Sequence, residues 1–121
     1  MRTISEITHN GKPLQDILDD HKKWVAGKGG TRADLTGAYL TGADLTGAYL
    51  TGAYGIYQFG PIGETGRIGY AVAHTDGAMF SLGCHWGNLA ETRKAIVAKY
   101  GRNSLYEKQV VLAGKIVMEA K

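Results

Sequence analysis

The most constraining feature of this sequence is a five-residue period that begins at Ala33. The chain reads ADLTG, AYLTG, ADLTG, AYLTG and AYGIY in succession. Side chains return to the same face every 3.6 residues in an α-helix and every two residues in a strand, so neither element produces a period of five. The sequence therefore predicts a repeat architecture, in which each unit is stable only against its neighbours.

This pattern resembles that of the pentapeptide-repeat family, in which alanine is followed by aspartate or asparagine, then leucine or phenylalanine, then two variable residues. The resemblance implies that each repeat forms one side of a square, right-handed β-solenoid and that four repeats complete one coil. It places the leucines inside, the alanines at the tight corners and the second residue of each repeat outside. These three sets are Leu35, Leu40, Leu45 and Leu50; Ala33, Ala38, Ala43, Ala48 and Ala53; and Asp34, Tyr39, Asp44, Tyr49 and Tyr54. Since Tyr54 lies four repeats after Asp34, it is expected directly above it.

A coil of this length needs a cover at both ends. Coils stack at the strand spacing of ~4.8 Å, so these repeats make one coil and the beginning of a second. The leucines then lie open above and below unless other elements cap them. A helix expected to begin near Pro13 and to end at Gly27, Gly29 and Gly30 is one candidate lid. Its apolar face carries Leu14, Ile17, Leu18, His21, Trp24 and Val25. The C-terminal half, or another copy of the chain, is the other candidate.

The C-terminal part predicts a β-hairpin. Residues 67–75 and 78–84 read as strands joined by Asp76-Gly77, which is a strong hairpin signal. A two-residue turn at this point places Ala73 opposite Phe80 and Ala71 opposite Leu82, on the face expected to carry helices. The other face would carry Tyr70, Val72, His74, Met79 and Ser81.

Two helices are expected after the hairpin. Asn88 with Glu91 forms a capping-box pattern, and Ser104 with Glu107 repeats it. The first helix carries Leu89, Ile96, Val97 and Tyr100 and stops at Gly101; the apolar face of the second would include Leu105, Val111, Leu112 and Ile116. The predicted fold class is α+β: an N-terminal helix, one short pentapeptide-repeat β-solenoid coil, then a β-hairpin followed by two α-helices. Residues 1–121 are expected to form a single domain, with an N-terminal helical cap over 1–30, the coil over 31–57 and the hairpin and helices over 58–121.

The composition limits the classes of partner. A formal charge of +3 and a pI near 9.0 favour anionic partners, although the basic residues are scattered. One branch of the family imitates a DNA duplex, but one coil is too short for that and the net charge has the wrong sign, so a nucleic-acid role is not expected. The start, MRTISEITHNGK, has no apolar h-region, no stretch approaches the ~20 apolar residues of a membrane span, and Cys84 is the only cysteine. A cytoplasmic location without a membrane partner is expected.

Patterns of catalysis and metal binding are missing from the sequence. It has no nucleophile elbow, no phosphate-binding Gly-x-x-x-x-Gly-Lys and no histidine pair at metal-binding helical spacing. Cys84-His85 is the only adjacent thiol and imidazole, and neighbours in a strand point to opposite faces. A non-catalytic protein without a metal or cofactor is therefore expected.

The candidate binding site is the loop from Gly83 to Asn88. Free N–H groups at a helix N-terminus attract anions, a tryptophan face can stack on a base, and an imidazole can hydrogen-bond a phosphate. The candidate ligand-binding residues are His85, Trp86, Asn88, Arg93, Tyr70 and Arg67. The alternative is that Trp86 packs over the coil and that Asn88 satisfies the helix end unaided.

The tail, in which Gly83-Cys84 leads through an aromatic residue into a capped helix, resembles that of small pentapeptide-repeat proteins of phages and prophages. That resemblance implies the host cytosol and favours sequestration of a small anionic, nucleotide-type signal of host defence. Two alternatives stay open: a module that blocks a host protein through its outward tyrosines, and an enzyme that cleaves a small phosphorylated ligand with His85 or His74. Because one coil exposes much apolar surface, a homo-oligomer is also expected.

Overall fold

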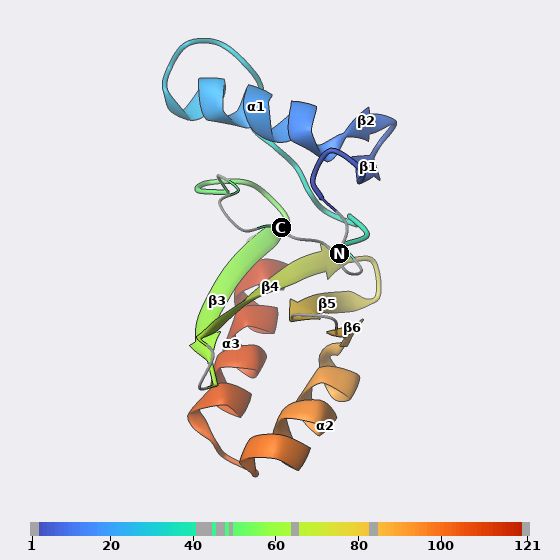
Figure 1. Ribbon diagram of the computed structural model, residues 1–121, viewed down its shortest axis with the longest axis vertical. Coiled ribbons are helices and arrows are strands. Elements are labelled where there is room, and N and C mark those ends of the chain that lie inside the picture. The colour runs from blue at the N-terminus through green and yellow to red at the C-terminus, as the bar shows by residue number, and fades with distance from the viewer. Residues whose placement is uncertain are drawn as a thin grey trace.

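The computed structural model describes residues 3–40, 45, 48, 50–63, 66–82 and 85–119. Its helices and strands mix in one chain, which confirms the α+β class (Figure 1). Their bounds are β1 Thr8–His9, β2 Lys12–Pro13, α1 Leu14–Val25, β3 Ile56–Ile62, β4 Arg67–His74, β5 Gly77–Leu82, β6 His85–Asn88, α2 Leu89–Tyr100 and α3 Leu105–Glu119. The order differs from the prediction, because β1 and β2 form a small hairpin before α1, and β3 and β6 flank the expected hairpin.

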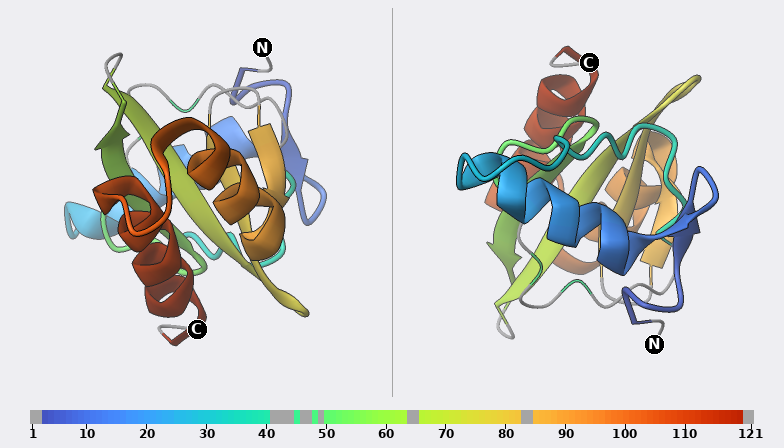
Figure 2. Two further views of the ribbon diagram at one scale, coloured as in Figure 1. Left: turned by 90° about the horizontal axis from the view of Figure 1, so that it is seen from below. Right: turned by 90° about the horizontal axis from the view of Figure 1, so that it is seen from above.

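The central element is the antiparallel sheet β3-β4-β5-β6, and the other elements are layered on its two faces. Figure 2 shows α2 and α3 over one face and α1 on the opposite side, and Figure 1 shows the described part of the repeat segment between α1 and the sheet. Two separate apolar clusters match these layers. One joins the sheet to α2 and α3, and the other joins α1, the repeat leucines and Val72 on the sheet.

The pairing of β4 with β5 differs by two residues from the predicted register. Ala71 lies opposite Phe80 and Ala73 opposite Ala78, because Thr75 and Asp76 form the turn and Gly77 already pairs with His74. Gly77 adopts a φ of 132°, a backbone conformation that glycine adopts without steric cost. Since side chains alternate with a period of two, a two-residue shift leaves every side chain on its predicted face. Ala71, Ala73, Phe80 and Leu82 accordingly lie in the cluster under α2 and α3.

Helix α3 packs on the sheet through a face that the sequence did not predict. Its buried residues are Glu107, Val110, Ala113, Gly114 and Val117, whereas Leu105 and Leu112 are 65% and 56% exposed. The reason is close packing. A Cβ on Gly114 would lie 3.1 Å from Cζ of Phe80, so only the small face of the helix lets its backbone approach the phenylalanine ring. The sequence analysis predicted that the larger aliphatic side chains would be buried, and for Leu105 and Leu112 this was wrong.

The repeat segment closes on itself after four repeats. Asp34 and Tyr54 form a parallel bridge, and the N–H of Tyr54 donates to the carbonyl of Ala33 over 2.9 Å. Leu35, Leu40 and Leu45 are buried, while Tyr39 and Tyr54 are exposed, as predicted. The β-solenoid itself is not detected: between residues 31 and 54, the described part of the chain contains this isolated bridge and no stacked coils. The expected positions Ala43, Asp44 and Tyr49 lie outside the described residues.

Helix α1 is the expected lid over one end of the coil. It begins directly after Pro13 and buries Leu14, Leu18 and His21, which confirms its position and its inner face. His21 connects the helix to the first and the last of the four repeats. Its Nδ1 accepts from the N–H of Ala33 over 3.1 Å, and its Nε2 donates to the carbonyl of Thr51 over 2.7 Å. Trp24 and Val25, assigned to the same face, are 42% and 38% exposed. The sheet covers the other end of the coil through Val72, so the C-terminal half provides the second lid.

Candidate functional site

The structure divides the predicted site between two faces of the sheet. His85 and Trp86 are neighbours in β6, so their side chains point in opposite directions. His85 lies on the helix side, where its Nε2 shares a hydrogen bond of 2.9 Å with the hydroxyl of Thr92. Trp86 lies on the coil side, with ring centroids 5.7 Å from Tyr39 and 5.9 Å from His74. Gly83 and Cys84, the start of the predicted loop, lie outside the described residues.

Asn88 and Arg93 are both engaged inside the protein. The side chain of Asn88 accepts from the N–H of Glu91, and the Glu91 carboxylate accepts from the N–H of Asn88, so the predicted capping box forms. Arg93 pairs with Glu107 across α2 and α3, with an N–O distance of 3.1 Å. The capping box thus satisfies N–H groups at the start of α2. Arg93, which was expected to add positive charge at this helix start, pairs with the carboxylate of Glu107 instead.

The two other predicted residues also separate. Tyr70 lies on the coil side of the sheet, half-buried against the cluster of repeat leucines. Arg67 lies at the exposed start of β4 and lines a cavity that His85 also lines. Among the six predicted residues, the structure therefore brings together one pair, Arg67 and His85, on the helix side, and another, Tyr70 and Trp86, on the coil side.

Glu107 is the carboxylate with the most partners near the predicted site. The N–H of Asn103 donates to its Oε1 over 2.6 Å, the N–H of Glu107 itself is capped by Ser104, and Arg93 contacts its Oε2. The Asn103 bond, followed by the Arg93 contacts, holds the pKa of Glu107 below its ordinary value of 4.5. The carboxylate form is therefore the one that the fold prefers.

This lowered pKa predicts an acid-sensitive stability. A group with a depressed folded pKa adds stability above its unfolded pKa, and the contribution is lost as the pH falls through the folded value. We expect the free energy of unfolding to fall below pH 4.5 more steeply in the wild type than in Glu107→Gln, as measured by denaturant titration at several pH values. Glu119→Gln, at the exposed far end of the same helix, is the control and should keep the wild-type slope. Equal slopes in all three proteins would contradict the assignment.

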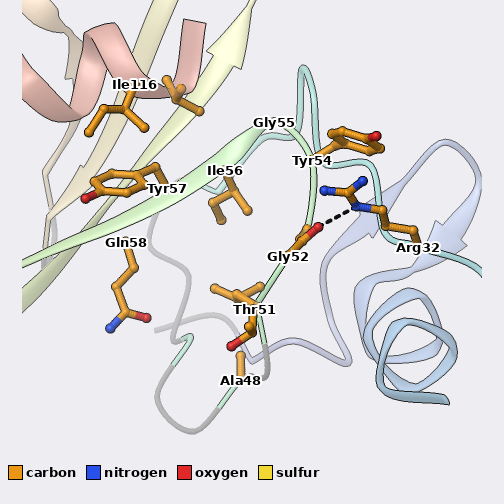
Figure 3. Close-up of a pocket in the computed structure, with 13 residues that line it drawn as sticks. Arg32, Ala48, Thr51, Gly52, Tyr54, Gly55, Ile56, Tyr57, Gln58 and Ile116 are labelled. Carbon is orange, nitrogen blue, oxygen red and sulfur yellow. Dashed lines mark hydrogen bonds between the residues drawn. The ribbon is translucent and has the colours of Figure 1, made fainter. Parts of the chain in front are cut away.

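A larger cavity, outside the predicted set, lies where the coil meets the sheet and α3 (Figure 3). Its volume is about 530 Å³. The lining comes from three places: Arg32 before the repeat, the last repeat turn with the start of β3, and the C-terminal half of α3. The described lining residues are Arg32, Ala48, Leu50, Thr51, Gly52, Ala53, Tyr54, Gly55, Ile56, Tyr57, Gln58, Ile116 and Val117. Arg32 is the one charged residue among them.

The position of Arg32 is fixed by the coil. Its Nε donates to the carbonyl of Gly52 over 2.5 Å, as the dashed line in Figure 3 marks, and its guanidinium carbon lies 3.4 Å from the ring centroid of Tyr54. Trp24 lies farther off, at 5.2 Å from the same carbon. Within the described residues, no acceptor is hydrogen-bonded to either Nη. The arginine is thus held by one nitrogen and a ring while its two terminal amino groups remain available.

Residues 31–54 match the family model described as pentapeptide repeats (8 copies). This span contains the five-residue period and both residues of the Asp34–Tyr54 bridge. This segment of the chain therefore consists of pentapeptide repeats. No curated protein and no solved structure matches the chain significantly. The family match covers the repeat segment and not the sheet and helices that follow it.

The arginine of the cavity could have been found from the repeat. Four repeats of five residues place residue n beside residue n + 20, which the Asp34–Tyr54 bridge confirms. The same rule places Arg32 beside Gly52, where it forms its hydrogen bond. Tyr57 and Gln58 carry no such signal, because they follow the last repeat and their position depends on β3.

Pentapeptide-repeat proteins are generally non-catalytic structural or interaction proteins. Within the described residues, no group of three or more His, Cys, Asp or Glu side chains could hold a metal ion. No helix in the same residues is long and apolar enough to cross a membrane.

Proposed function

We propose that this chain is a non-catalytic binding protein that takes a small, planar, anionic ligand of the nucleotide type into the cavity between the coil and α3. One observation carries the proposal: a guanidinium whose two terminal amino groups have no acceptor among the described residues stands in a cavity whose other described lining residues are uncharged and include two tyrosines. Tyr57 is 38% exposed, so its ring is open to a ligand, and Tyr54 is 44% exposed with Arg32 stacked on one face of its ring.

The size and the chemistry of the cavity support this ligand class. Pockets for small molecules have volumes of about 300–1,000 Å³, and this one has about 530 Å³. Stacking of a base on one aromatic side chain contributes about 1–3 kcal/mol. Arg32 supplies a planar pair of donors that matches a phosphate or a carboxylate. Ile56 and Ile116 give an apolar wall, and the Gln58 amide can hydrogen-bond the edge of a base.

The same lining supports binding in preference to turnover. General acid–base catalysis uses a side chain that can exchange a proton near neutral pH, most often histidine or a carboxylic acid. The described lining residues include no His, Asp, Glu or Cys. A protein that holds such a ligand intact would act by lowering its free concentration. With the phage-like tail, this supports sequestration of a host signal in the host cytosol.

The proposal predicts saturable heat in calorimetric titration with a panel of mono-, di- and cyclic nucleotides, with no change in the nucleotides recovered afterwards. Tyr57→Ala removes a stacking face and should weaken binding about tenfold or more, since about 1.4 kcal/mol corresponds to a factor of ten. Gln58→Glu adds a negative charge at the cavity and should also weaken the binding of an anionic ligand. Tyr39→Ala is the matched control, because Tyr39 is an exposed tyrosine of the coil that does not line the cavity. No heat with any nucleotide, or equal loss in Tyr57→Ala and Tyr39→Ala, would contradict the proposal, and a recovered product would establish an enzyme.

A second candidate, a module that blocks a host protein, is favoured by the aromatic cluster of Tyr39, His74 and Trp86. Tyr39 is 65% exposed and rests on the two other rings at centroid distances of 6.1 and 5.7 Å. His74 is in turn held by donation from its Nε2 to the carbonyl of Ala38. A rigid, exposed tyrosine is typical of protein interfaces. For a protein partner, Tyr39→Ala would weaken binding and Tyr57→Ala would not, the reverse of the nucleotide case.

The homo-oligomer expected from the sequence stays a prediction.

A further inference from the structure

A second, smaller cavity lies between the sheet and α2. Its volume is about 190 Å³. Leu82 and Ile96 form part of its apolar wall, and its polar lining consists of Arg67, His85, Thr92, Lys99 and Tyr100. At about 30 Å³ for each water molecule, the space holds about six waters. It is smaller than the pockets of about 300–1,000 Å³ that hold small-molecule ligands, but it has room for a tetrahedral oxyanion.

The charges around this cavity are unbalanced. Arg67 and Lys99 both line it, and its described lining contains no carboxylate. Arg32 and Arg93 are each held by an acceptor elsewhere in the protein, whereas the guanidinium of Arg67 has no hydrogen-bond or ion-pair partner among the described residues. Lys99 has its Nζ 5.5 Å from the ring centroid of Tyr100, which is a contact with a face and not with a charge. Like charges at one cavity repel, and a bound anion removes that cost.

Neutral hydrogen-bonding groups complete the site. Thr92 is fully buried, and its hydroxyl is fixed by the 2.9 Å hydrogen bond to Nε2 of His85. The hydroxyl of Tyr100 packs so closely against Gly63 that a Cβ at that glycine would overlap it, which fixes the tyrosine at the rim. Glu91, the one carboxylate of α2, accepts a hydrogen bond from the N–H of Asn88 in the capping box.

We propose that this cavity is a second binding site, specific for a small oxyanion such as a phosphoryl or sulfate group. Arg67 and Lys99 supply the charge, the hydroxyls of Thr92 and Tyr100 supply directed hydrogen bonds at a partly buried position, and Nε2 of His85 orients the Thr92 hydroxyl by donating to its oxygen. Charge-assisted hydrogen bonds of this kind are about twice as strong as neutral ones. The site is distinct from the nucleotide cavity, because the two share none of their described lining residues.

The test is a titration of the full chain with inorganic phosphate, followed by two-dimensional ¹⁵N–¹H NMR, with sodium chloride adjusted to keep the ionic strength constant. We expect saturable shifts of the amides of Arg67, Thr92 and Lys99. Arg67→Gln should weaken the phosphate affinity about tenfold or more, as a lost charge-assisted hydrogen bond predicts. Lys94→Gln is the matched control. It removes one positive charge from an exposed position of α2 that does not line the cavity, so it should leave the phosphate affinity unchanged.

Further arms distinguish the sources of the anion and keep the proposal open to refutation. A short phosphoserine peptide that binds tighter than inorganic phosphate would identify a phosphorylated protein as the source, and the reverse order would identify a free anion. If Arg67→Gln does not fold, Lys99→Gln takes its place. Linear, unsaturated shifts, or equal affinities of Arg67→Gln and Lys94→Gln, would overturn the site. Neither outcome would affect the nucleotide cavity, whose tests use other residues.

Discussion

Phe80→Ala is expected to lower the free energy of unfolding by about 3–5 kcal/mol, the range of large aromatic deletions in protein cores. Phe80 is fully buried in the middle of the sheet, with its ring centroid 6.1 Å from that of Phe59 in an edge-to-face arrangement. Gly114 of α3 approaches its other side, and a glycine has no side chain that could move into the space left behind. The cavity would therefore stay largely open, which makes the cost high.

Chemical denaturation at neutral pH measures this effect directly. Leu112→Ala is the control, because it truncates a large apolar residue of the helix that packs on Phe80 but does so on the exposed side. Surface changes of this kind usually stay within about 0.5 kcal/mol. A loss of similar size in both variants would show that α3 is packed through its leucines, as the sequence suggested, and not through Ala113 and Gly114.

Gly55→Ala is expected to cost about 2–5 kcal/mol, because it adds two penalties at the point where the coil closes. Gly55 has a φ of 77°, and a left-handed conformation costs a residue with a Cβ about 1–2 kcal/mol. The added Cβ would also lie 2.7 Å from Cα of Thr36 and closer still to its nitrogen. Overpacking of this kind typically costs about 1–3 kcal/mol, and here the neighbour is backbone that cannot rotate away.

Gly37→Ala separates the two penalties. Gly37 has nearly the same φ, 78°, but a Cβ there meets nothing within 4 Å, so only the conformational cost of about 1–2 kcal/mol applies. The difference between the two variants, measured by thermal or chemical unfolding, reports the close approach of Gly55 to Thr36. If both variants lose the same stability, the coil does not close at this contact.

Local signals in the sequence were sufficient to predict where the helices begin and end. Pro13 before α1, the capping box of Asn88 with Glu91 and the end at Gly101 all act within a few residues, so their effects are visible without the rest of the chain. The faces of the strands were equally predictable, because alternation has a period of two. The register was not, since His74 pairs with Gly77 and only the geometry of the turn decides between two registers that keep the same faces.

The candidate sites depended much more on long-range contacts. The loop that ends at Asn88 carries a helix start, an aromatic residue and a histidine within a few positions, and this local pattern predicts a binding site. In the structure, His85 and Trp86 are neighbours in a strand and their side chains lie on opposite faces of the sheet. Arg93 pairs with Glu107, which lies fourteen residues farther along the chain. The sequence alone gave no reason to connect Arg67 with Lys99, or Tyr57 with Ile116, since each pair meets only because the sheet and the helices pack together.

The sequence by itself determined the repeat, its buried leucines, its outward tyrosines and the return of the chain at Tyr54 to Asp34, because a fixed period specifies which residues share a direction. Only the tertiary structure decided which elements cover the coil, which face of α3 meets the sheet and where cavities remain. The physical reason is the same in each case. Periodicity sets the direction of a side chain on its own element, whereas the approach of two elements depends on the volumes on both sides, such as Gly114 against Phe80.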